Sequence, residues 1–133
     1  MLAAHRHQTQ LLPYALLLVA ILFSVTGELL LKHGMNRLGV LELEPALLAP
    51  ALARAFSNPF VLGGFSCIFI GSLFWLAVIS RVHLSLAYPL LSLSYVLVVA
   101  ASWLFLGEQI TWVRVMGVIV IIAGVSLVFS SGQ

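Results

Sequence analysis

Hydroxyl side chains recur at helical spacing within one long apolar stretch of this sequence, Leu84 to Glu108. They are separated by steps of three, four, three and seven residues, so they share one side of a helix. In lipid, a hydroxyl group needs a hydrogen-bonding partner or a water-filled cavity. We therefore expect this side to face inward, towards a cavity or a partner helix. The residues, here called the polar stripe, are Ser85, Tyr88, Ser92, Tyr95 and Ser102.

Pro89 lies within the same stretch and predicts a helix kink. Proline has no backbone N–H, so the carbonyl of Ser85, four residues earlier, is free to bind another group. Two interpretations of the polar stripe stay open. Its hydroxyls either join neighbouring helices, at ~0.6 kcal/mol per contact, or bind a polar substrate.

A cluster of charged residues ends the first apolar stretch. Lys32 and Arg37 are candidate phosphate ligands, and His33 joins them when it is protonated. Glu28 precedes Lys32 by four residues, which is the favourable order for an ion pair on a helix. Glu28 either neutralises Lys32 or binds an ammonium group of a substrate. The two basic residues either bind substrate or anchor the helix at the membrane surface.

The composition indicates an integral membrane protein. Of 133 residues, 62% are hydrophobic and 8% are charged, whereas soluble domains have about 25% charged residues. A net charge of +2 gives no nucleic-acid-binding surface. The single cysteine, Cys67, can form no intrachain disulfide. The sequence has no nucleophile–base pair, metal-ligand cluster or phosphate-binding glycine loop, so we expect neither an enzyme nor a cofactor or metal site.

Four apolar stretches are long enough to cross the ~30 Å hydrocarbon layer as helices. We predict an all-α membrane protein, a single domain over residues 1–133 that forms a four-transmembrane-helix bundle. A segment between the first two spans is predicted to form a short helix at the membrane surface, with an ordered loop as the alternative. The spans lie at about 11–31, 59–80, 84–106 and 111–130, and the short segment at about 44–56.

Capping residues indicate where the helices begin and end. We expect Gly34 to end the first helix as its C-cap. Asn58, followed by a proline, is expected to cap the second span. Glu108 is expected to stabilise the start of the fourth, because a carboxylate near a helix N-terminus is favourable.

Small residues indicate where helices pack closely in the membrane. Gly63, Cys67 and Gly71 recur every four residues, a stripe that allows another helix to approach. Gly117 and Gly124 are seven residues apart and form a candidate dimer seam on the last span. Four helices make a small bundle, so a large cavity requires a second chain.

Three motifs occur in order along the chain: GELLLKHG at 27–34, FWLAVISRVHLSLAYPL at 74–90, and SWLFLGEQIT with G-x6-G at 102–124. With them, the sequence resembles the small four-helix members of the drug/metabolite transporter superfamily, which are SMR-like or EamA-like. The resemblance covers nearly the whole chain. It implies a multi-pass protein of the bacterial inner membrane that contacts membrane lipid.

Two branches of that superfamily imply different substrates. The small multidrug resistance branch depends on a membrane-embedded glutamate eight residues before a lysine. Here Ser24 occupies that position relative to Lys32, which argues against proton-driven drug export. The other branch contains the subunits that flip aminoarabinose linked to undecaprenyl phosphate. The positions that match its pattern are Gly27, Glu28, Lys32, Gly34, Leu84, Ser85, Ala87, Tyr88, Pro89, Ser92 and Tyr95.

The second resemblance implies a flippase subunit for a lipid-linked monosaccharide on undecaprenyl phosphate, with an amino sugar as one option. It also implies a homodimer, or a heterodimer with a similar small subunit. The alternatives are a small multidrug or metabolite exporter and an assembly subunit without transport of its own. The expected substrate-binding residues are Glu28, Lys32, His33, Arg37, Ser85, Tyr88, Ser92 and Tyr95.

Overall fold

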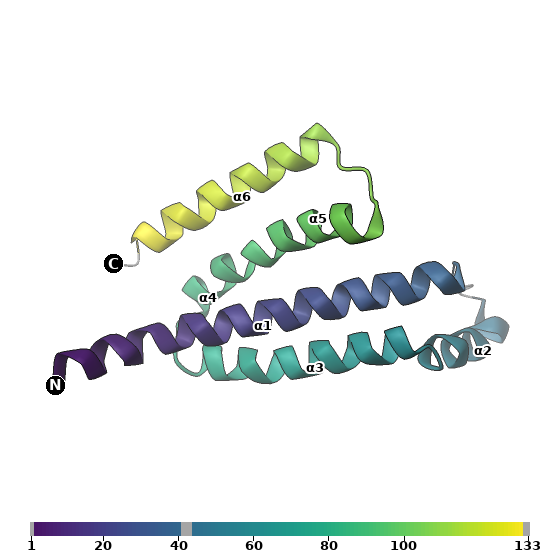
Figure 1. The fold of residues 1–133 in the computed structure, drawn as a ribbon, viewed down its shortest axis with the longest axis horizontal. Coiled ribbons are helices and arrows are strands. Elements are labelled where there is room, and N and C mark those ends of the chain that lie inside the picture. Colours follow the sequence, from purple (N-terminus) through teal and green to yellow (C-terminus); the bar gives the residue numbers. More distant parts are fainter. Residues whose placement is uncertain (1, 41–43, 132–133) are drawn as a thin grey trace.

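A computed structural model describes residues 2–40 and 44–131, and its regular structure over them is helical (Figure 1). Four helical stretches are long and apolar enough to cross a membrane, which confirms the predicted all-α, four-span fold. A short helix lies between the first two spans, as predicted. The helices are α1 (Leu2–Leu38), α2 (Pro45–Phe56), α3 (Pro59–Ile79), α4 (Leu84–Leu91), α5 (Leu93–Leu106) and α6 (Trp112–Ser131).

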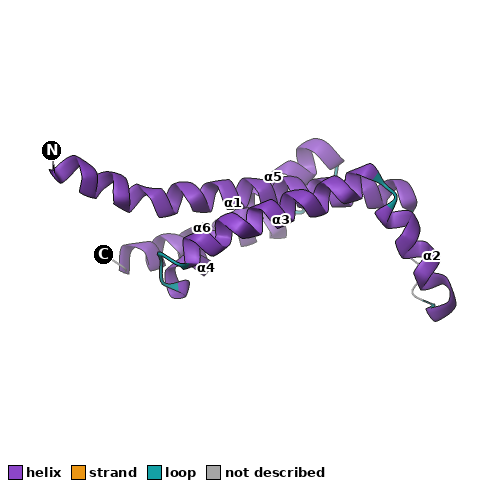
Figure 2. Ribbon diagram, turned by 90° about the horizontal axis from the view of Figure 1, so that it is seen from below, coloured by secondary structure: helices purple, strands orange, loops and turns teal. Residues whose placement is uncertain are grey.

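The spans lie side by side, and α1 occupies a central place (Figure 1). It packs against α3 on one side and against α5 on the other, while α6 packs on α4 and α5. The helices α1 and α5 run in the same direction, so their C-terminal ends are at the same end of the molecule. At that end, α2 turns away from the direction of the spans (Figure 2).

The packing of α1 on α3 depends on glycines that bring the two backbones together. A Cβ atom at Gly64 would lie 2.8 Å from the carbonyl oxygen of Gly27, and a Cβ atom at Gly27 would lie 2.7 Å from that of Gly64. At Gly71 it would lie 3.1 Å from the carbonyl oxygen of Ala20. At Gly63 the nearest atom would be 3.8 Å away, which is an ordinary contact. The expected stripe was therefore wrong at Gly63, because Gly64 is the residue that faces α1.

The first helix is longer than the sequence indicated. It continues through Gly34 to Leu38 and is followed by Gly39 with a φ of +83°. The expected C-cap at Gly34 is therefore wrong. Gly34 serves packing instead, since a Cβ atom there would lie 2.8 Å from Cγ2 of Val61. This extension places Lys32 inside the helix and Arg37 in its last turn.

Asn58 caps α3 and joins it to α1. Its Oδ1 accepts a hydrogen bond from the backbone N–H of Phe60 at 2.9 Å, which confirms the predicted N-cap. Its Nδ2 donates to the carbonyl oxygen of Gly34 at 3.4 Å. One side chain thus fixes the start of α3 against the last turns of α1.

A small apolar core joins α1 to α3 and α4. Leu17, Ile21 and Val25 of α1 are buried together with Val78 of α3 and Ala87 of α4. These residues lie towards the N-terminal half of the span in α1. The C-terminal half, which includes Lys32, lies beyond this core.

The third span is interrupted at Ser92, between α4 and α5. Ser92 follows Pro89 by three residues, and both its N–H and its hydroxyl donate to the Pro89 carbonyl oxygen. The span ends at Gly107, whose φ of +66° is left-handed and favours glycine. The chain then turns sharply towards α6.

The last span has few contacts with the rest of the molecule. Val125 is its one buried residue, and its start lies apart from α1 (Figure 1). Near its end, the Phe129 ring contacts that of Tyr14 edge-on, with centroids 6.2 Å apart. A Cβ atom at Gly117 or Gly124 would meet nothing within 4 Å. Both glycines therefore lie on a face that this chain leaves uncovered.

We predict that Gly64→Ala destabilises the protein and that Gly63→Ala does not. The added methyl group at position 64 would overlap the Gly27 carbonyl oxygen, and overpacking typically costs ~1–3 kcal/mol. Both variants gain the same helix propensity from alanine, so Gly63→Ala is a matched control. Thermal unfolding of the detergent-purified protein measures the difference. Equal melting temperatures for the two variants would contradict this account of the packing.

Candidate functional site

An ion pair joins α1 to the turn between α5 and α6. Nζ of Lys32 lies 3.8 Å from Oε1 of Glu108, and the two side chains are 53% and 38% exposed. Glu108 directly follows the left-handed Gly107, and its N–H donates to the carbonyl oxygen of Ser102 at 3.2 Å. The carboxylate is thereby attached to the last turn of α5.

Two expectations about these carboxylates need correction. Glu28 forms no ion pair within residues 2–40 and 44–131, so it does not neutralise Lys32, and its side chain is exposed. The partner is Glu108 because α1 and α5 run in the same direction and end side by side. Glu108 precedes α6 by several residues and pairs with Lys32, rather than serving the start of α6 as expected.

A polar pocket of about 210 Å³ opens beside this ion pair. We call it the polar pocket because its wall includes the charged residues Glu108 and Arg114 and two hydroxyl-bearing residues of the polar stripe. The helices α5 and α6 and the turn between them supply its walls. The lining residues are Tyr95, Val98, Val99, Ser102, Glu108, Ile110 and Arg114.

An apolar pocket of about 500 Å³ lies between α1, the start of α3 and the end of α5. Its wall includes His33, whose ring contacts that of Phe60 edge-on with centroids 4.9 Å apart. The Arg37 guanidinium carbon lies 4.7 Å from the centre of the same Phe60 ring. The lining residues are Thr26, Leu29, Leu30, His33, Phe60, Phe105 and Leu106.

Both pockets are lined in part by residues near the C-terminal end of α5. Ser102 lines the polar pocket and Leu106, one helical turn further on, lines the apolar one. On α1, Lys32 precedes His33 of the apolar pocket and pairs with Glu108 of the polar pocket. The Lys32 ammonium group is thus 3.8 Å from a carboxylate oxygen of Glu108, which lines the polar pocket, and the residue after Lys32 lines the apolar one.

The structure divides the polar stripe into two parts. Tyr95 and Ser102 lie in the polar pocket. Ser85 and Tyr88 lie towards the other end of the span, and the Tyr88 ring contacts that of Trp75 edge-on at 5.7 Å. Fourteen residues of helix separate Tyr88 from Ser102, which corresponds to ~20 Å. Ser85 and Tyr88 are therefore not brought together with Lys32.

The hydroxyl groups in the polar pocket are available for a ligand. Within the described part of the chain, neither Tyr95 nor Ser102 forms a side-chain hydrogen bond. By contrast, Ser66 and Ser92 donate to carbonyl oxygens of their own helices. Tyr95 is 49% exposed. Among the expected site residues, Ser92 is thus occupied locally whereas Tyr95 is not.

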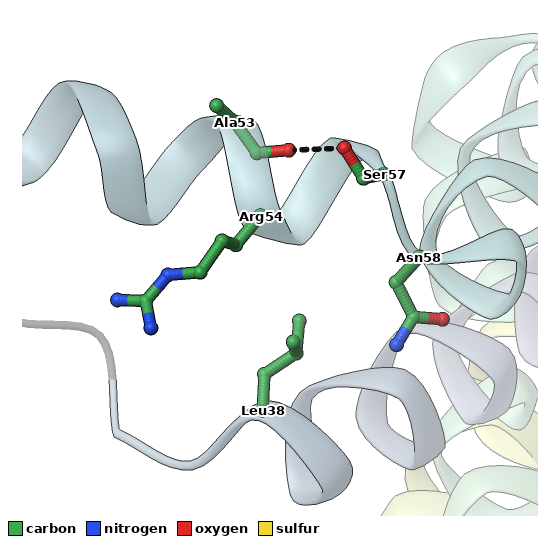
Figure 3. A pocket seen from close by; sticks show the side chains of 5 residues that line it. All are labelled: Leu38, Ala53, Arg54, Ser57 and Asn58. Atoms are coloured by element: carbon green, nitrogen blue, oxygen red, sulfur yellow. Dashed lines mark hydrogen bonds between the residues drawn. The ribbon is translucent and has the colours of Figure 1, made fainter.

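A further pocket of about 390 Å³ lies where α1, α2 and α3 meet (Figure 3). Arg54 extends from α2 into the space between α2 and Leu38 of α1. The Ser57 hydroxyl donates to the Ala53 carbonyl oxygen at 2.8 Å, and Asn58 binds Gly34. Its hydroxyl and amide groups are therefore already hydrogen bonded, and Arg54 is the charged residue among the described residues that line it.

Sequence reasoning missed three residues of the polar pocket as site residues. Ser102 belongs to the polar stripe, so its spacing was a usable signal. Glu108 ends the apolar stretch and was interpreted only from its position near the start of the fourth span, and Arg114 lies beyond the stretch. Nothing in their local spacing indicates that Glu108 meets Lys32.

Comparison with known proteins decides the family. A model of the EamA-like transporter family matches residues 10–130. The chain belongs to this family. It is therefore a multi-pass membrane protein of transporter type rather than an enzyme. The resemblance inferred from the three sequence motifs is confirmed.

Curated relatives have related names. The protein of Shewanella sediminis named "Probable 4-amino-4-deoxy-L-arabinose-phosphoundecaprenol flippase subunit ArnF" is 33% identical over 122 residues, covering 85% of this chain and 84% of that protein. A protein of the same name from Sodalis glossinidius is 37% identical, covering 80% and 85%. An Aeromonas hydrophila protein named as the ArnE subunit is 39% identical over 70 residues, covering 53% and 61%. No solved structure matches.

We predict that the Lys32–Glu108 pair contributes little to folding. Both side chains are partly exposed, and exposed ion pairs typically contribute less than about 1 kcal/mol. A double-mutant cycle with Lys32→Met and Glu108→Gln, followed by thermal unfolding in detergent, measures the coupling. A coupling above about 2 kcal/mol would make the pair a structural element instead.

Proposed function

We propose that this chain is a subunit of a flippase that moves a monosaccharide linked to undecaprenyl phosphate across a bacterial inner membrane. Such a lipid has an apolar tail, an anionic phosphate and a polar sugar, in that order. The observation behind the proposal is the set of binding surfaces at the end of α1 and α5. The apolar pocket, the Lys32 ammonium group and the polar pocket all lie towards this end of the molecule, one surface for each part of the lipid.

The apolar pocket suits the first part of the polyprenyl tail. Leu29 and Leu30 of α1 face Phe105 and Leu106 of α5 across it. Its volume of about 500 Å³ accommodates only part of a long chain, so the remainder lies in the surrounding lipid.

Lys32 and Arg114 suit the phosphate. Lysine binds phosphate as a compact charge, and arginine can form two parallel hydrogen bonds to it. Arg114 lies in the first turn of α6, where the helix dipole disfavours a cation. A bound anion beside Arg114 would remove that unfavourable interaction.

The relatives support the lipid-linked substrate over the alternative of a small multidrug or metabolite exporter. Those that match most of this chain are named as flippase subunits for an aminoarabinose phosphoundecaprenol. The embedded carboxylate expected for proton-driven export is replaced by Ser24. The bacterial sources of these relatives support an inner-membrane location.

A second small subunit is proposed to cover α6. Most of this helix is exposed, and Gly117 and Gly124 leave room for another helix to approach. The relatives named ArnE and ArnF are each called a subunit, which supports assembly with a copy of this chain or with a similar chain.

The transport proposal predicts that Lys32→Ala slows appearance of the lipid in the outer leaflet by about tenfold or more, since hydrogen bonds to charged groups contribute ~1.5–3 kcal/mol. Spheroplasts of the source bacterium that express each variant would be exposed to a membrane-impermeant amine reagent. Labelled undecaprenyl phosphate-aminoarabinose is then measured. Arg54→Ala removes a cation from the other pocket and serves as the control. If spheroplasts that express Lys32→Ala at the wild-type protein level show as much labelled lipid as the wild type, the proposal is contradicted.

The assembly proposal predicts that Gly117→Leu together with Gly124→Leu weakens subunit association without unfolding the chain. The added side chains enter space that is open in the single chain, so they clash only with a partner. Cross-linking in membranes with and without the source bacterium's other small subunits distinguishes self-association from pairing with another chain. Unchanged cross-linking in both would place the interface elsewhere.

A further inference from the structure

The wall of the polar pocket includes a carboxylate, which a binding site for a simple anion would not need. Glu108 lines this pocket together with Arg114 and pairs with Lys32. A carboxylate beside a phosphate site repels the phosphate, since like charges a few ångströms apart disfavour each other. Its presence is favourable only if it neutralises a protein cation or binds a cation of the ligand.

Neutralisation of Lys32 alone does not explain the position of Glu108. The Lys32–Glu108 separation of 3.8 Å is close to the limit for an ion pair, and both side chains are partly exposed. Such pairs are weak and are easily exchanged for other partners. Arg114 forms no ion pair within the described ranges, although it lines the same pocket. The carboxylate is thus loosely paired on one side and open to the pocket on the other.

The backbone fixes Glu108 beside the hydroxyls that would bind a sugar. The Glu108 N–H donates to the carbonyl oxygen of Ser102, whose side chain lines the same pocket. Tyr95 lies seven residues before Ser102 on the same side of α5. A sugar in contact with these two hydroxyl groups would therefore have the carboxylate at its edge.

We propose that Glu108 is the specificity-determining residue for a positively charged sugar, and that the ligand exchanges partners with the Lys32–Glu108 pair. The phosphate binds Lys32, and the ammonium group of the sugar binds Glu108. The ligand is thus a zwitterion, whose two charges replace the single ion pair of the empty site. This inference rests on the proposed function and adds to it the requirement for an amine.

The test compares two lipids that differ in one charge. The probes are undecaprenyl phosphate-linked 4-amino-4-deoxy-arabinose and the same lipid with its amine acetylated, which makes that group neutral. Binding to the purified full-length chain is titrated by native mass spectrometry. We expect the wild-type chain to prefer the amine by about tenfold or more, as for a charge-assisted hydrogen bond. Glu108→Gln should reduce this preference to about twofold or less by weakening only the amine-containing lipid.

Control variants separate this role from others. Glu44→Gln removes an exposed carboxylate before α2 that makes no side-chain capping bond, and it should keep the full preference. If Glu28→Gln abolishes the preference instead, the ammonium group binds Glu28 and the inference is overturned. If Glu108→Gln weakens both lipids equally, Glu108 only positions Lys32, which also overturns it.

The failure of this inference can be distinguished from failure of the proposed function. Equal binding of the two lipids by the wild-type chain would overturn the role of Glu108 and leave a lipid-linked sugar as the substrate. Binding of neither lipid, by the chain alone or with a second small subunit present, would overturn both.

Discussion

The close approach of α1 and α3 is the constraint on which the arrangement of the molecule depends. In lipid, apolar side chains gain little by leaving the solvent, so helices associate through tight van der Waals packing. Gly27 and Gly64 allow this by placing backbone against backbone, and Asn58 adds a hydrogen bond at the end of the interface. The helices α1 and α3 therefore form a tightly packed pair. The helices α4 to α6 attach to its other side through a small core and leave pockets at the end where α1 and α5 terminate.

Features that depend on local sequence could be predicted. The four spans follow from uninterrupted apolar length, and the Asn58 cap follows from an asparagine before a proline. Register between helices could not be predicted in the same way. Gly63 and Gly64 are adjacent in sequence, and both are followed by Gly71 at a spacing that fits a helical face. Only the orientation of α3 against α1 decides that Gly64 makes the close contact.

The candidate site shows the same limit more sharply. The polar stripe was evident from spacing, and its residues Tyr95 and Ser102 do line a pocket. The polar stripe extends along the whole span, so only some of its residues can lie beside Lys32, and spacing alone does not say which. The partner of Lys32 could not be predicted either. Glu28 is the obvious partner on a single helix, whereas Glu108 reaches Lys32 only because two distant segments end side by side.

The attachment of each charge has a mechanical consequence. Lys32 belongs to α1, which packs tightly on α3. The backbone N–H of Glu108, by contrast, is hydrogen bonded to a carbonyl oxygen near the end of α5. Any rocking of α5 and α6 relative to α1 and α3 must therefore lengthen or shorten the Nζ–Oε1 separation. Because attraction between opposite charges falls with distance, the tilt of one helix pair against the other sets the electrostatic energy of the ion pair. Moving α5 and α6 away from α1 and α3 would therefore also separate Lys32 from Glu108.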